Sequence, residues 1–95
     1  MRRLVEVFQG ECRSLMSQLA EAVAESDVRQ VQYLAHTLKG SANLLGAARL
    51  GATAFELDRA AKEDRRDDLP RLFEVLQEDA AQVQAALEAF MGSGV

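Results

Sequence analysis

Apolar residues recur every three to four positions along most of the chain, which is the period of an amphipathic α-helix. The pattern predicts four helices, over about residues 2–25, 27–45, 47–62 and 68–91. The expected buried stripes are Leu4, Phe8, Cys12, Leu15, Leu19 and Val23; Val28, Val31, Leu34, Ala35, Leu38, Ala42 and Leu45; Leu50, Ala54, Leu57 and Ala61; and Leu69, Leu72, Phe73, Leu76, Ala80, Val83, Leu87 and Phe90. Because short breaks separate the stripes, we expect an all-α fold, an antiparallel up-down four-helix bundle.

The breaks between the predicted helices carry residues that stop and start helices. Ser26 and Asp27 are good N-cap residues for the second helix. Gly46 is placed to end that helix as a C-terminal cap. Asp67 or Asp68 is a candidate cap for the fourth helix.

Length and composition narrow the function classes. The 95 residues suit one domain, spanning 1–95, and the 48% hydrophobic content favours a globular fold. A net charge of −4 gives no basic footprint for nucleic acid. There is no apolar run of about 18 residues, so we expect no membrane contact and a cytoplasmic location. The charged run over 62–68 predicts a solvated loop, and Cys12 is expected in the core.

The single histidine, His36, falls on the polar side of the second predicted helix. At about 100° per residue it lies roughly 150° from the centre of the apolar stripe, so it faces outward. Gly40 lies one turn further on the same face, and Lys39 lies at its flank. Tyr33 and Leu44 also fall on this face, one on each side, which predicts a small docking surface around the imidazole.

Gly40 and Lys39 suit a histidine that accepts a phosphoryl group. A glycine inside a helix costs about 1 kcal/mol relative to alanine, so its presence needs a local reason. One reason is space beside the imidazole of His36 for a phosphoryl group or a partner loop. The Lys39 charge would favour a neutral, nucleophilic ring nitrogen and would balance the charge of an attached phosphoryl group.

These residues form a recognisable motif. The chain resembles the histidine-containing phosphotransfer (HPt) domains of bacterial multistep phosphorelays and hybrid sensor histidine kinases through the run His36-x-x-Lys39-Gly40-Ser41-Ala42, followed by Leu45-Gly46-Ala47. The resemblance implies a four-helix bundle that carries a phosphoryl group on His36 and exchanges it with the aspartate of a response-regulator receiver domain. It also implies that Mg²⁺ belongs to the receiver, so this chain needs no metal or other cofactor.

The resemblance points to further site residues. HPt domains often place Gln or Glu of the third helix near the histidine, and the matching position is Asp58, which would hold the proton on one ring nitrogen. A solvated Asp58 paired with Arg59 or Lys62 is an open alternative. We expect Tyr33, Thr37, Asn43 and Leu44 to dock the partner, with Asn43 narrowing the space beside Gly40.

Two other functions stay open. The phosphoacceptor domain of chemotaxis-type histidine kinases shares the His-x-x-Lys-Gly run and is loaded by a kinase in the same chain. A structural or adaptor bundle with a silent His36 is the alternative from another class. The sequence shows no nucleotide-binding loop, so we expect a phosphotransfer intermediate without kinase activity of its own, which could form part of a hybrid histidine kinase. We expect a monomer; the receiver, the signal, the direction of phosphoryl flow and the full-length context are not given by the sequence.

Overall fold

The computed structural model describes residues 2–93, and the side chains of residue 3 and residues 6–89. This part of the chain forms four α-helices and one short 3₁₀ helix: α1 (Arg2–Ala24), α2 (Val28–Leu44), α3 (Ala48–Lys62), η1 (Arg66–Asp68) and α4 (Leu69–Ser93). Each predicted helix is present, with its ends within two residues of the expected ones. The all-α four-helix bundle is therefore confirmed.

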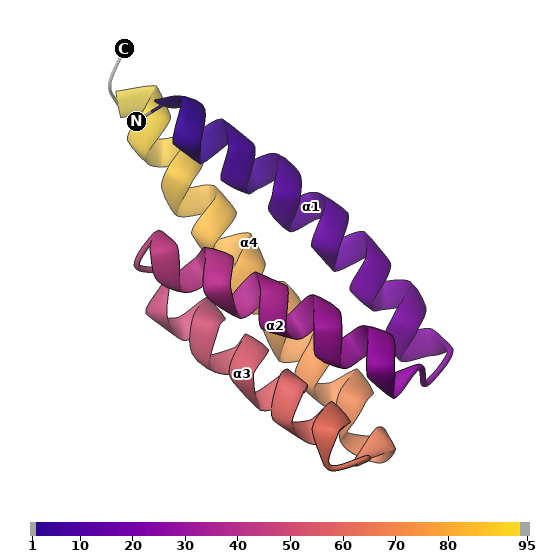
Figure 1. Ribbon diagram of the computed structural model, residues 1–95. Coiled ribbons are helices and arrows are strands. Elements are labelled where there is room, and N and C mark those ends of the chain that lie inside the picture. The colour runs from indigo at the N-terminus through magenta and orange to yellow at the C-terminus, as the bar shows by residue number, and fades with distance from the viewer. Residues whose placement is uncertain (1, 94–95) are drawn as a thin grey trace.

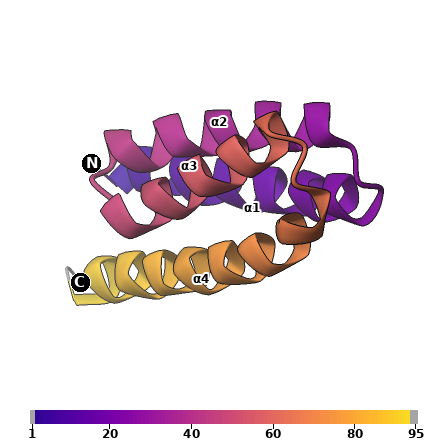
Figure 2. The ribbon, with the colours of Figure 1, turned by 90° about the horizontal axis from the view of Figure 1, so that it is seen from below.

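The helices are arranged as a ring, in which each helix packs on the next and α4 returns to α1 (Figures 1 and 2). The bundle is elongated, with extents of 46 × 19 × 17 Å. α1 and α4 are longer than α2 and α3, and the start of α1 lies beside the end of α4 (Figure 1). The shorter pair, α2 and α3, is the one that presents the candidate site.

The predicted apolar stripes form the core. The side chains of Leu4 and Phe90 lie outside the described part, and every other member of the stripes is buried or packed against the buried cluster. Each fully buried leucine contributes about 1.5–3 kcal/mol relative to an exposed one. The core fixes which faces of α2 and α3 remain outside.

Cys12 lies in this core with 1% of its surface exposed, as expected. Burial raises the pKa of the Cys12 thiol above its ordinary value, and a hydrogen bond with Gln84 opposes part of that effect. A buried thiol with a raised pKa is a poor nucleophile. Cys12 therefore acts as a small core residue.

The three helix-to-helix turns share one geometry. Each has a residue with positive φ just after the helix: Ser26 (53°), Gly46 (74°) and Asp64 (57°). In each, the N–H of the next residue donates to the carbonyl oxygen five residues earlier, for example Ala47 N to Ala42 O at 2.8 Å. This is the Schellman arrangement, in which glycine is the unstrained residue. Gly46 therefore ends α2 as predicted, and Asp27 caps its start by accepting from Gln30 N.

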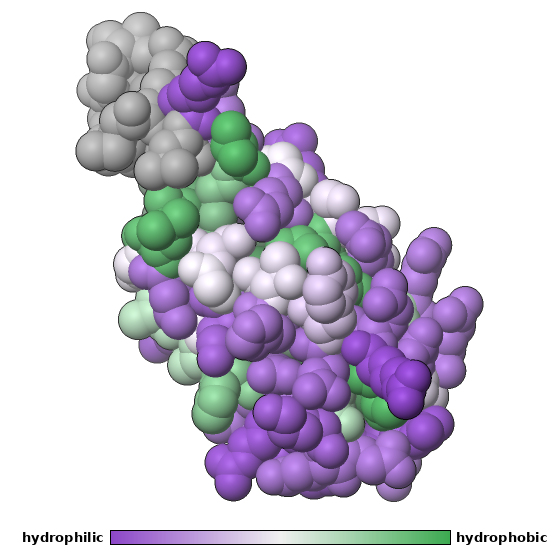
Figure 3. All heavy atoms as spheres, in the orientation of Figure 1, coloured by the Kyte–Doolittle hydropathy of each residue, from purple (hydrophilic) through white to green (hydrophobic). Residues whose placement is uncertain are grey.

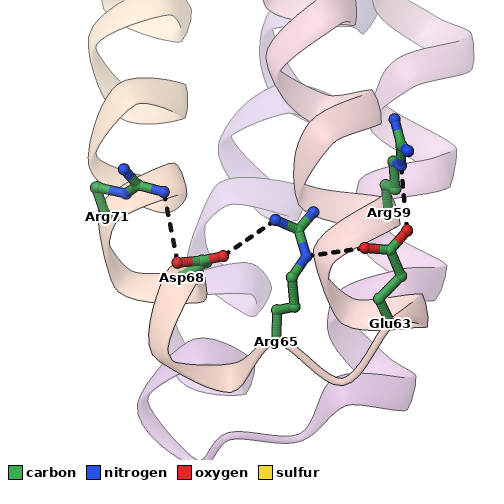
Figure 4. Close-up of polar contacts among 5 residues, drawn as sticks. All are labelled: Arg59, Glu63, Arg65, Asp68 and Arg71. Carbon is green, nitrogen blue, oxygen red and sulfur yellow. Dashed lines mark hydrogen bonds and ion pairs between the residues drawn. The ribbon is translucent and has the colours of Figure 1, made fainter.

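The charged run between α3 and α4 is exposed, as the sequence predicts, and forms a chain of ion pairs. It links Arg59, Glu63, Arg65, Asp68 and Arg71 in that order (Figure 4). The Asp68 carboxylate therefore pairs with the guanidinium groups of Arg65 and Arg71. The predicted cap at the start of α4 is replaced by the short 3₁₀ helix η1, which ends at Asp68 and continues directly into α4. Exposed pairs of this kind add about 0–1 kcal/mol each. Figure 3 shows the hydrophilic surface that covers this end of the bundle.

No helix in the described part of the chain is long and apolar enough to cross a membrane.

Candidate functional site

His36 projects from the outer face of α2, with 70% of its side chain exposed. The opposite face of α2 is fixed in the core by Leu34, Ala35 and Leu38. Because these residues flank His36 on the helix, their burial forces the imidazole towards solvent. Tyr33 and Leu44 are exposed on the same helix, by 66% and 78%, as the sequence predicts.

Gly40 opens the space next to His36. A Cβ added at Gly40 would meet nothing within 4 Å beyond its own helix. The glycine is therefore not explained by close packing between helices. The space is available to a group that comes from outside the chain.

Lys39 lies beside His36 but extends towards α3. Its Nζ atom lies 5.2 Å from the centroid of the Phe55 ring, in a cation–π contact. Phe55 is 44% exposed and adds an aromatic surface that the sequence analysis did not include. The signal was present, since Phe55 is a large apolar residue outside the narrow alanine-rich stripe of its helix.

Asp58 reaches His36 from α3. Its Oδ2 atom lies 4.0 Å from His36 Nδ1, which is within reach of an ion pair but beyond the length of a hydrogen bond. Asp58 is only 8% exposed, and its Oδ1 atom is buried with no hydrogen-bond partner. The alternative of a solvated Asp58 paired with Arg59 or Lys62 is wrong, because the Asp58 side chain is buried. Arg59 pairs with Glu63 at 3.2 Å instead, and among the described residues Lys62 forms no ion pair with Asp58. The carboxylate thus lies on the Nδ1 side of the exposed imidazole ring.

Thr37 and Asn43, expected in the docking surface, have local partners. The Thr37 hydroxyl donates to the carbonyl oxygen of Tyr33 at 3.0 Å. The Asn43 carboxamide lies against Gly51 of α3, in the position that a side chain there would take. Asn43 therefore does not narrow the space beside Gly40, contrary to our expectation, because its side chain turns towards α3.

Other contacts hold the site helices in place. The Ser41 hydroxyl donates to Glu11 Oε1 at 2.9 Å and ties α2 to α1. Thr53 donates to the buried carboxylate of Asp79 and ties α3 to α4. The bonds fix both helices that carry the His36 and Asp58 side chains.

Two cations lie near His36: Arg29, which the sequence analysis did not include, and Lys62, which it considered only as a partner of Asp58. An open depression beside the imidazole is lined by Arg29, Gln32, Tyr33, His36, Asp58 and Lys62. Arg29 lies two helical turns before His36, and Lys62 one turn after Asp58. Only the pairing of α2 with α3 brings them together. Among the described residues, no group of three or more His, Cys, Asp or Glu side chains is placed to hold a metal ion.

Comparison with known proteins identifies a family and a shared fold. Residues 3–86 match the Hpt domain family. The chain is 36% identical over 66 residues to the phosphorelay protein LuxU of Vibrio cholerae, a match that covers 70% of this chain and 58% of that protein. It is also similar to the crystal structure of histidine-containing phosphotransfer protein B (HptB) from Pseudomonas aeruginosa PAO1. That match has a TM-score of 0.88 at 23% identity and covers 90% of this chain and 75% of the other.

Proposed function

This chain belongs to the Hpt domain family, and from that premise we propose that it carries a phosphoryl group on His36 and exchanges it with the aspartate of a receiver domain. The observation that supports this most directly is the exposed imidazole, which has open space at Gly40 on one side and a buried carboxylate facing Nδ1. A silent surface histidine would need neither feature.

The proposed transfer needs no separate base. With the proton on Nδ1, towards Asp58, the lone pair of Nε2 is free to attack. Nε2 forms a bond to the phosphorus of the receiver's aspartyl phosphate, while the bond from phosphorus to the aspartate oxygen breaks. That electron pair stays on the oxygen and restores the receiver's carboxylate. Donation to a receiver is the reverse, and His36 returns to the neutral imidazole.

In this proposal the other site residues balance the charge of the phosphoryl group and leave room for the partner to reach His36. Lys39 supports the charge of the phosphoryl group, and Gly40 admits the group and the partner's loop. Tyr33 and Leu44 supply apolar contact for the receiver, with Thr37 and Asn43 at its edge. The Mg²⁺ that assists phosphoryl transfer would be bound by the receiver, and this domain would contribute no cofactor.

The match spans 58% of the length of LuxU. The partners of this chain and the larger protein context in which it acts are therefore proposed here. Phosphorelay proteins of this family exchange phosphoryl groups with receiver domains. We propose that this domain does so in the cytoplasm, as a monomer. Loading by a kinase in the same chain remains the alternative.

The direct test is phosphoryl transfer from a labelled receiver. The domain is incubated with phosphorylated receiver domains, and the protein is assayed for label that is lost in acid and kept in base. We expect label on the wild type and none on His36→Gln, with both proteins equally folded by circular dichroism. Label on His36→Gln would rule out His36 as the acceptor. Wild-type protein that takes no label from any of a panel of receivers would favour the adaptor function.

A further inference from the structure

A second exposed apolar surface lies between α3 and α4, which pack side by side in opposite directions (Figure 2). An open groove of about 300 Å³ separates their outer sides, and it shares no lining residue with the depression beside His36 except through the helix α3 itself. Phe55 and Val75 are 44% and 42% exposed at this groove. The lining is mostly apolar and consists of Ala52, Thr53, Phe55, Glu56, Leu72 and Val75.

The groove is a fixed feature of the fold. The Thr53 hydroxyl donates to the buried carboxylate of Asp79, which holds α3 and α4 together along it. The Phe55 ring contacts α2 as well, because Lys39 Nζ lies 5.2 Å from its centroid. Phe55 therefore marks the edge of the groove nearest to α2, and the groove extends from there to Val75 on α4.

The shape and lining of the groove suit the side chains of a protein better than a small ligand. Pockets for small molecules hold about 300–1,000 Å³ and enclose most of the ligand, with several polar groups that orient it. This groove is at the lower limit of that range and is open to solvent. Of its polar side chains, Thr53 is already bonded to Asp79, which leaves Glu56. Large apolar side chains of a partner protein therefore match it best.

A helix is the partner element that fits between two helices. The backbone N–H and C=O groups inside α3 and α4 are bonded within each helix, so they cannot pair with an added strand. A third helix can instead place side chains at positions i and i+3 or i+4 into the groove, as amphipathic helices do in other complexes. The apolar groove thus predicts an amphipathic helix as its occupant.

The charges around the groove indicate the charge of that helix. Glu56 forms part of the wall, and Glu78 lies one helical turn after Val75 on α4. In the described part of the chain neither carboxylate forms an ion pair. The arginines near them, Arg59 and Arg71, are already paired with other carboxylates. The uncompensated negative charge favours a basic partner and disfavours a second copy of this chain, whose net charge is −4.

We propose that the groove between α3 and α4 docks a basic amphipathic helix of a partner protein. The apolar side of that helix covers Phe55, Leu72 and Val75, and a lysine or arginine pairs with Glu56. The inference does not depend on phosphoryl transfer by His36. A helix in this groove leaves the imidazole uncovered, because His36 does not line the groove.

The test uses two synthetic peptides of about 18 residues, long enough to form an isolated helix in part. Both carry leucine at the same i, i+3, i+4 and i+7 positions, and their polar sides hold lysine and glutamine in one and glutamate and glutamine in the other. Binding is followed by the ¹⁵N–¹H chemical shifts of the whole domain. The lysine peptide should shift the amides around Phe55 and Val75 and bind at least tenfold more tightly than the glutamate peptide.

Matched variants separate apolar contact from charge. Val75→Asp should weaken binding of the lysine peptide about tenfold, although its added negative charge by itself attracts that peptide. Val7→Asp is the control, because Val7 is 58% exposed but lies on α1, and it should leave the affinity within about twofold. Val75→Ala should act in the same direction with a smaller effect, and it serves if Val75→Asp is less stable by circular dichroism.

Glu56→Gln tests the predicted ion pair. It should weaken binding by up to about fivefold at low salt, the range of an exposed ion pair. Glu21→Gln on α1 makes the same change in net charge far from the groove and should have a smaller effect. Arg49→Gln removes a cation two helical turns before Glu56, about 10 Å along α3, and should not weaken binding.

Each result supports or overturns the proposal. Loss of affinity in Val75→Asp and Glu56→Gln with unchanged controls supports it, and so does unchanged binding by His36→Gln. Shifts centred on another face, or equal losses in Val7→Asp and Val75→Asp, would overturn it. Movement of the same amides when the domain alone is concentrated would assign the groove to a second copy. Loss of binding in His36→Gln would show that the groove belongs to the phosphotransfer site.

Discussion

The carboxylate of Asp58 meets His36 with one oxygen: Oδ2 lies 4.0 Å from Nδ1, while Oδ1 is buried without a hydrogen-bond partner. A buried, unpaired carboxylate oxygen lowers the stability of the fold. Asp58 lies beside the only histidine of the sequence, so a role at His36 would explain why the chain tolerates this loss of stability. The pair therefore yields one prediction for activity and another for stability.

Asp58→Asn should slow phosphoryl transfer without abolishing it. The amide keeps the shape but loses the charge that, in the proposed mechanism, holds the proton on Nδ1 of His36. The contact is long and the imidazole exposed, so we expect a loss of about 1 kcal/mol, roughly fivefold in rate. The measurement is the single-turnover rate of label transfer from a phosphorylated receiver. A rate equal to that of the wild type would show that Asp58 does not orient His36.

Asp58→Leu should stabilise the domain while it reduces transfer. The substitution removes the unpaired Oδ1 atom and places an apolar side chain beside the core residue Leu57. We expect a gain of about 1 kcal/mol in the free energy of unfolding, or roughly 4–8 °C in Tm. Thermal unfolding by circular dichroism measures it. A clear loss of stability would mean that Oδ1 has a partner, such as an ordered water.

Substitutions of Gly40 distinguish its effect on the stability of the fold from its effect on the space beside His36. Gly40→Ala should raise the free energy of unfolding by about 1 kcal/mol, because alanine favours helix and meets no neighbour there. Gly40→Tyr should leave the fold intact and reduce transfer by about tenfold or more, because the ring occupies the space beside the imidazole. Denaturant unfolding and transfer rates test the pair. Normal transfer by Gly40→Tyr would place the incoming group elsewhere.

The shared geometry of the three turns predicts opposite changes in stability for substitutions at Ser26 and Gly46. Ser26 carries a positive φ of 53°, which glycine adopts without strain. Ser26→Gly should therefore raise the free energy of unfolding by about 0.5–1 kcal/mol, and Gly46→Ser should lower it by a similar amount. Urea unfolding of both variants provides the comparison. Changes of the same sign in both would contradict the shared geometry of the turns.

The exposed apolar residues near His36 should contribute to receiver binding. Tyr33→Ala and Leu44→Ala should each weaken the complex by about 1 kcal/mol or more, about fivefold in Kd. Val7→Ala is the control, since Val7 is 58% exposed but lies on α1. Isothermal titration with the receiver measures all three. Unchanged affinity for both Tyr33→Ala and Leu44→Ala would move the docking surface away from α2.

Much of the fold was predictable from the sequence because each helix reveals its buried face locally. The stripe through Leu34 and Leu38 shows which side of α2 is inside, and it therefore shows that His36 lies outside. Gly46 and Asp27 mark the ends of that helix by backbone chemistry that acts within a few residues. The charged turn was harder, since whether Asp68 caps a helix or binds Arg65 depends on side chains that compete for it.

The tertiary structure decided which residues meet across helices. A periodic pattern fixes the inner face of a helix but not its offset along a neighbour. That offset brings Asp58 to His36, Phe55 to Lys39, and Arg29 into one hollow with Lys62. It also turns Asn43 onto Gly51 and away from Gly40. The sequence by itself thus determined the helices and the outward histidine, and the packing of α2 on α3 determined the charges around it.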